Sequence, residues 1–167
     1  FLFSWVEPSD KNTEDFYARF FNTNLQGQGE KARLTAFHPA PSGRTKVRFP
    51  LGAVDKDNLR LTFRLERDPE RVVEHLSIPL ASIEKGESIK VDGLTSGSPD
   101  RFLGALEAVS PPKQRADLPS MACNAAECFV VWNEEGKDGV YSAPIPLDST
   151  KPLFKKEVVK NAGRHPA

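Results

Sequence analysis

The chain has 167 residues, with 23 basic and 23 acidic side chains and no net charge. Its length allows a substantial core, and the charge balance gives no electrostatic reason to expect nucleic acid or an anionic membrane as a partner. Fourteen prolines and few long helical apolar patterns favour an all-β chain. There is no run of about 18 apolar residues, so no transmembrane segment is expected, and we find no signal peptide.

The first part of the chain predicts three strands. Residues 1–5 are apolar on both faces, which is typical of a central strand. A return strand is expected at 16–21 and an outer strand at 31–37, followed by a Pro- and Gly-containing linker at 38–45. We therefore assign residues 1–43 to a partial first unit, and because the chain starts with Phe we expect a processed or truncated product.

The second part predicts four strands, at residues 47–54, 58–65, 72–80 and 88–91. The charged segment 64–71 has features of a helix start, because Asp68-Pro69-Glu70 fits a cap followed by proline. Polar loops at the corresponding places elsewhere favour a turn instead. A Gly- and Ser-rich segment at 92–100 marks the next boundary, so the second unit spans residues 44–98.

The third unit spans residues 99–167. Its first segment, 101–109, fits either a strand or a short helix, and 110–118 is a charged loop. A hairpin follows, whose two strands contain residues 119–123 and 128–132, because β-branched and aromatic residues between turn clusters predict antiparallel strands. We expect a further strand starting after a turn at 133–139, an outer strand at 153–159 and a polar tail.

Three stretches of the chain resemble one another. Residues 50–63 align with residues 119–132 without a gap, and residues 78–82 align with 145–149. An aromatic residue closes the apolar run each time: Trp5, Phe63 and Trp132. Four-stranded repeats of about 40 to 50 residues are typical of propeller blades, and the longer spacing here, about 60 to 70 residues, predicts long loops. The alternative is a β-sandwich whose hairpins are alike in composition only.

The hairpin pattern resembles the repeats of secreted bacterial β-propellers. It consists of a strand of small residues, a short polar turn, and the apolar run Cys128-Phe129-Val130-Val131-Trp132. The resemblance implies that these are the inner two strands of a blade, and several such repeats carry paired cysteines at these places. The second repeat departs from it, since Phe63 replaces Trp, and Val54 and Leu59 replace the cysteines. The resemblance implies a scaffold and no particular chemistry.

Cys123 and Cys128 are the sharpest local signal. Four residues lie between them, and on a hairpin this spacing can place them opposite one another, within reach of a disulfide. Two free buried thiols and a metal site remain open, although two cysteines do not complete a zinc site and His38, His75 and His165 lack ligand spacing. A disulfide would indicate an extracellular, periplasmic or outer cell-surface location.

Other candidates have a structural alternative. Trp5 and Trp132 are possible ligand platforms, but their recurrence with Phe63 favours a structural core. A carboxylate-rich turn has residues able to bind calcium or act as an acid–base pair, but a solvated turn is the simpler expectation: Glu134, Glu135 and Asp138. The basic C-terminal end fits an acidic partner, or a solvated strand and tail: Lys151, Lys155, Lys156, Lys160 and Arg164.

We therefore expect an all-β fold of antiparallel four-stranded sheets, about three blades of an incomplete β-propeller. The expected function is a non-catalytic extracytoplasmic scaffold or protein-binding module, a segment of a larger protein or assembly, without catalytic residues, cofactor or metal. Another chain, or the missing part of the same protein, would complete the propeller. The alternatives are a fragment of a propeller-type glycan hydrolase or lyase, with carboxylates of raised pKa at a central funnel, and a tandem of β-sandwich modules.

Overall fold

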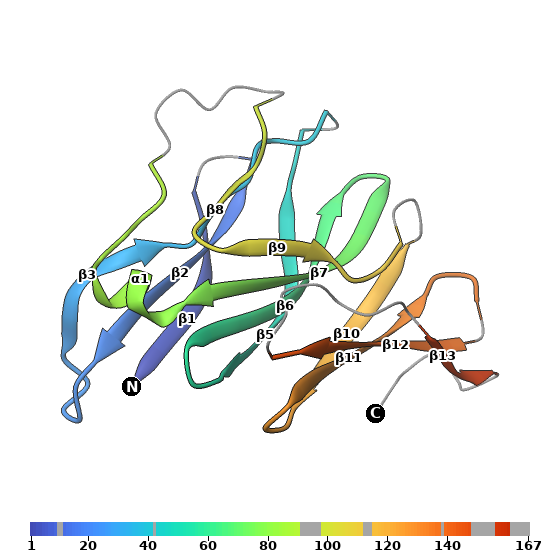
Figure 1. Cartoon of the computed structure of the whole chain (residues 1–167). Helices are drawn as coiled ribbons and strands as arrows, with labels where there is room; N and C mark the ends of the chain where they lie inside the picture. Colours follow the sequence, from blue (N-terminus) through green and yellow to red (C-terminus); the bar gives the residue numbers. More distant parts are fainter. Residues whose placement is uncertain are drawn as a thin grey trace.

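The computed structural model describes residues 1–9, 12–41, 43–90, 98–111, 115–137 and 139–147, and the backbone of 156–160. Within them the fold is all-β, with antiparallel sheets and one helix of five residues. The described strands form neither a closed barrel nor a closed propeller. Three meandering sheets follow one another along the chain, and Figure 1 shows the second between the first and the third.

The first sheet has three strands in the order β1-β2-β3. These strands are β1 (Leu2–Pro8), β2 (Glu14–Phe21) and β3 (Gly27–Arg33). The expectation of a central strand at residues 1–5 is wrong, because β1 lies at the edge of the sheet and pairs with β2 alone among the described residues. On one face of β1, Leu2 and Val6 pack against the core, whereas on the other face Phe3 is exposed.

The second sheet has four strands in the order β5-β6-β7-β9. They are β5 (Lys46–Val54), β6 (Asn58–Arg67), β7 (Glu70–Pro79) and β9 (Ala105–Ala108). The turn expected within 64–71 is present but shorter, since β6 and β7 pair as far as Arg67 and Glu70. The fourth strand expected at 88–91 is wrong for the described residues 88–90, which are not extended in a sheet. β9 takes that place.

Two small elements lie between the larger sheets. The helix α1 (Leu80–Glu84) directly follows β7, and its Ile83 is buried in the core. The pattern of residues 78–82 gave no helical signal, because one turn is too short to show a period. A two-stranded sheet pairs β4 (Thr35–Ala36) with β8 (Arg101–Phe102). Residues 101–109, which fitted either a strand or a helix, thus contain two strands.

The third sheet has the order β10-β11-β12-β13. Its strands are β10 (Ala116–Cys123), β11 (Glu127–Glu134), β12 (Gly139–Pro146) and β13 (Lys156–Lys160). β13 includes the backbone of the later part of the strand expected at 153–159, whereas 153–155 and 161–167 lie outside the described residues.

Two apolar clusters hold the sheets together. The first joins the inner face of the first sheet, with Phe16 and Leu34, to the face of β6 that carries Leu61 and Phe63. The second joins Val73 of β7 to the face of β11 that carries Trp132. β6 is therefore covered on both sides, and every residue from 59 to 65 is buried. A strand with both faces covered lies in the middle of a stack of sheets.

Candidate functional site

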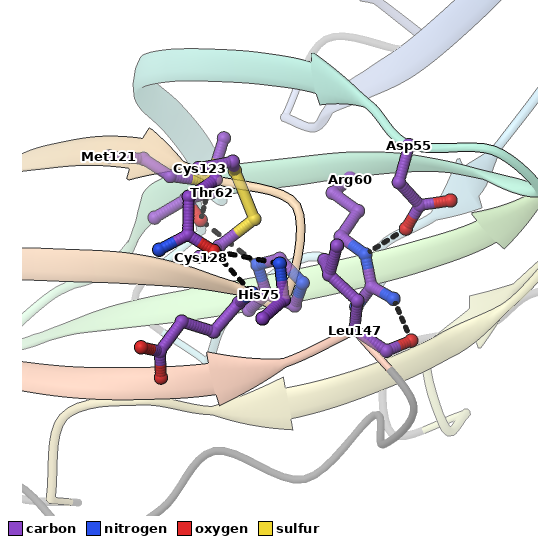
Figure 2. Close-up of a disulfide and its surroundings, with 11 residues drawn as sticks. Asp55, Arg60, Thr62, His75, Met121, Cys123, Cys128 and Leu147 are labelled. Carbon is purple, nitrogen blue, oxygen red and sulfur yellow. Dashed lines mark hydrogen bonds and ion pairs between the residues drawn. A yellow bond between two sulfur atoms is a disulfide. The ribbon is translucent and has the colours of Figure 1, made fainter.

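The two cysteines lie at the end of the β10–β11 hairpin (Figure 2). The backbone N–H of Asn124 donates to the carbonyl of Glu127 at 2.9 Å and closes the turn, which leaves Cys123 and Cys128 as the next, non-hydrogen-bonded pair. Side chains approach most closely in such pairs. The Cα atoms are 3.9 Å apart, and the sulfur atoms are bonded. Cys128 is buried, whereas Cys123 is exposed.

The β5–β6 hairpin repeats this geometry without cysteines. Val54 lies opposite Leu59, as Cys123 lies opposite Cys128. Both first strands also contain an irregularity at the same place, where Phe49 and Leu118, each followed by proline, have φ of 51° and 44°. A positive φ is unusual for a bulky residue. Two such residues in matching positions show that the hairpins share backbone structure as well as composition.

Polar side chains line the interface between the second and third sheets (Figure 2). Arg60 is 1% exposed, with its Nε 2.5 Å from Asp55 Oδ2, and its Nη2 donates to the carbonyl of Leu147 at 2.8 Å. Burial opposes ionisation of Asp55, but the bond from Arg60 and two backbone N–H groups lower its pKa below the usual value. Asp55 lies in the β5–β6 turn and Leu147 follows β12, so Arg60 ties the two sheets together.

Thr62 and His75 form a second contact at this interface. The Thr62 Oγ1 atom is 3.0 Å from His75 Nδ1 and donates to Met121 Sδ at 3.1 Å. A hydroxyl has one proton, so both contacts are satisfied when the proton on His75 is at Nδ1. Burial, aided by the charge of Arg60, lowers the pKa of His75 to about 4. His75 is therefore neutral at physiological pH.

The three aromatic residues of the repeat occupy matching positions in the sheets. Trp132 lies opposite Tyr141 and stacks on it, and Trp5 lies opposite Tyr17 and stacks on it, with ring centroids 6.1 and 6.3 Å apart. Phe63 and Trp132 are 0% exposed. Trp5 is only partly buried and contributes to neither apolar cluster.

The carboxylates expected in a turn at 133–139 are not simply solvated, and Glu134 is the last residue of β11. Glu134 is 2% exposed, and Lys137 Nζ lies 2.7 Å from its Oε2. Glu135 is exposed, and Arg115 Nε lies 2.8 Å from its Oε2. Asp138 lies outside the described residues, as do the side chains of the basic C-terminal residues. Where it is described, the chain contains no group of three or more His, Cys, Asp or Glu suited to a metal ion.

A charged cluster on the other face of the second sheet was missed from the sequence. Asp100 accepts from the backbone N–H of His38 at 3.0 Å, lies 2.7 Å from His38 Nδ1, and pairs with Arg67. Glu74 lies near them, and burial raises its pKa to about 7, with a smaller opposing effect from Arg67. In the strand register Glu74 occupies the place of the stacked tyrosines, opposite Phe63. In the sequence, only the alignment of residues 78–82 with 145–149, which places Glu74 at the position of Tyr141, could have drawn attention to Glu74. A single glutamate in an apolar strand forms no recognisable motif.

The first sheet leaves one face uncovered. In the second and third sheets the face that carries Phe63 or Trp132 packs against the preceding sheet. The corresponding face of the first sheet carries Phe1, Phe3 and Trp5, and Phe1 is 70% and Phe3 48% exposed. Phe3 packs edge-on against Phe21 with ring centroids 5.2 Å apart. We call this surface the open face, and it is the strongest candidate interaction site.

Comparison of the chain with family models, with curated proteins and with solved structures gave no match. The described residues include no helix long and apolar enough to cross a membrane.

Proposed function

We propose that this chain is a non-catalytic scaffold or protein-binding module, and that it is a segment of a larger β-propeller protein or assembly. The observation that carries the proposal is the stacking of three antiparallel meanders in one orientation, with the open face at one end. Blades of a propeller pack face to face in this way. Exposed aromatic side chains on a sheet face beside such a stack, here Phe1 and Phe3, are consistent with a protein interface.

An extracytoplasmic location is part of the same proposal. The bond between Cys123 and Cys128 supports it, because disulfides persist in oxidising compartments and are rare in the cytosol. Cys123 is exposed, so a reducing environment would have access to the bond.

The proposal is tested by light scattering of the purified chain over a range of concentrations. We expect self-association that increases with concentration, because Phe1 and Phe3 expose apolar surface. Phe3→Ser should weaken it, whereas Leu25→Ser, which removes an exposed apolar side chain in the β2–β3 turn, should not. Circular dichroism checks that both variants are folded. A parent chain that stays monomeric and monodisperse at high concentration would contradict the proposal.

One observation favours the alternative, a fragment of a propeller-type glycan hydrolase or lyase. Glycosidases use a carboxylic acid of raised pKa as the proton donor, and the pKa of Glu74 is about 7. Glu74 lines neither of two surface hollows of about 580 and 420 Å³, however. Assay of the parent and of Glu74→Gln on a panel of polysaccharides decides this: an activity lost in the variant would establish the enzyme.

A further inference from the structure

The strand that carries the repeat's aromatic residue has a neighbour on each side in two of the three sheets. β6 lies between β5 and β7, and β11 lies between β10 and β12. β1 corresponds to β6 and β11, because Trp5 faces Tyr17 as Trp132 faces Tyr141. Within the described residues, β1 has β2 on one side and no strand on the other.

The backbone of β1 shows which groups are available at this edge. The N–H and C=O groups of Phe1 and Phe21 bond to each other, at 2.8 and 2.7 Å, so these residues form a hydrogen-bonded pair. Such pairs alternate along an antiparallel ladder. Phe3 and Trp5 therefore bond to β2, whereas the N–H and C=O groups of Leu2, Ser4 and Val6 point to the free edge.

The second sheet gives the same result independently. The N–H of Asp55 donates to the carbonyl of Asn58 at 3.0 Å and closes the β5–β6 turn. By the same alternation, Ala53 with Arg60 and Leu51 with Thr62 are hydrogen-bonded pairs. The positions in β1 that match Arg60 and Thr62 are Leu2 and Ser4. The free edge thus has the hydrogen-bonding pattern that β6 uses to hold β5.

The space beside β1 continues a row of first strands. β10 lies in contact with β5, and β5 in turn lies in contact with β1. One such contact is at Gly52, where a Cβ would be 3.7 Å from Ser4 Oγ. A strand paired with the free edge of β1 would extend this row by one member and continue an interface that the fold already contains.

We propose that the free edge of β1 binds an extended segment of a partner polypeptide as an antiparallel strand. The partner has the sequence chemistry shared by β5 and β10. Arg60 and Phe129 are the residues that match Leu2, and each lies opposite an alanine, Ala53 in β5 and Ala122 in β10. We therefore expect alanine opposite Leu2 in the partner strand. Four residues before that alanine, β5 and β10 both have a bulky apolar residue followed by proline: Phe49-Pro50 and Leu118-Pro119. Strand addition of this kind takes affinity from backbone hydrogen bonds and specificity from side-chain pockets. This inference rests on the proposed function and names its partner.

The test uses the full chain and a synthetic peptide with the sequence of β5, Lys46–Val54. Amide hydrogen exchange, followed by NMR, is measured with and without the peptide. We expect saturable binding that slows exchange at Leu2, Ser4 and Val6 and leaves Phe3 and Trp5 unchanged, since these already bond to β2. An N-methyl group on the peptide residue equivalent to Leu51 should abolish binding, and one at Gly52 should not.

Two protein variants supply the matched control. Ser4→Pro removes an N–H that points away from β2, which an edge strand tolerates, and it should abolish peptide binding. Ser4→Ala keeps the N–H and should retain binding. Unchanged exchange at Phe3 and Trp5 shows that β1 still pairs with β2 in both variants.

Three results would overturn the inference. The first is a peptide that does not protect Leu2, Ser4 and Val6. The second is protection of these amides in the free monomer, which means that the chain itself covers the edge. The third is protection that appears with dimerisation and is lost in Ser4→Pro, which means that a second copy is the occupant. The two proposals can fail separately. If the chain binds the peptide but stays monomeric at high concentration, the strand site is supported and the scaffold proposal is contradicted.

Discussion

Trp132 with Tyr141 and Trp5 with Tyr17 are the same stacked pair in two sheets, with different surroundings. Trp132 is covered by the second sheet and is 0% exposed, whereas Trp5 lies on the open face and is partly buried. The stacking geometry is nearly equal, with interplanar angles of 27° and 23°. The comparison shows that the local sequence sets the pair, and that the neighbouring sheet sets its burial.

The largest loss of stability is expected when the buried tryptophan, Trp132, is removed. Trp132→Ala should destabilise the fold by about 3–5 kcal/mol, because it leaves a cavity in the core between two sheets. Chemical denaturation followed by circular dichroism measures the loss. A midpoint close to that of the parent would contradict the burial of Trp132 and restore the interpretation of Trp132 as a ligand platform.

The middle sheet changes the comparison, because Glu74 replaces tyrosine there. Its pKa is about 7 in the folded protein and 4.5 in an unfolded chain, so the folded state binds more protons between these values. The contribution of Glu74 to the free energy of unfolding therefore decreases as pH rises from about 4.5 to 7, by an amount on the order of 3 kcal/mol. In Glu74→Gln this decrease should be absent.

The effect is measured as the difference in free energy of unfolding between the parent and Glu74→Gln at pH 5 and pH 8. The difference is needed because His75, whose pKa is lowered to about 4, acts in the opposite direction: its contribution is lost as pH falls from about 6.5 to 4. A difference that does not change with pH would show that Glu74 is hydrated.

The sequence predicted the elements that local chemistry determines. Two matching hairpins followed from residues 50–63 and 119–132, since small residues, polar turns and apolar runs act over a few positions. It did not predict the neighbours of those elements. The residues after α1 resembled a fourth strand, but β9 takes that place by pairing with β7 across a long connection. The polar interface at Arg60 and His75 was likewise missed, because partners such as Leu147 lie far away in the sequence.

The two hairpins allow a smaller effect to be isolated. Cys123→Val combined with Cys128→Leu copies the Val54–Leu59 pair into the third sheet. The disulfide closes a short loop, so its loss should destabilise the fold by less than about 2 kcal/mol. Denaturation of the double variant measures this. Intact mass with and without reductant tests the bond itself, and two alkylatable thiols in the unreduced, denatured parent would show that it does not form.

The smallest effect is expected at Trp5. Trp5→Ala should destabilise the isolated chain by about 1 kcal/mol, because the side chain loses its stacking on Tyr17 and a hydrogen bond to Glu7 but leaves no cavity between sheets. The measurement is made over a range of protein concentrations, with Trp132→Ala as the reference. If the two variants lose equal stability at every concentration, Trp5 is covered by its own chain in solution, and the open face does not exist. If the loss at Trp5 grows with protein concentration, a partner surface covers the tryptophan, because only an interface between molecules makes the contribution of a side chain depend on concentration.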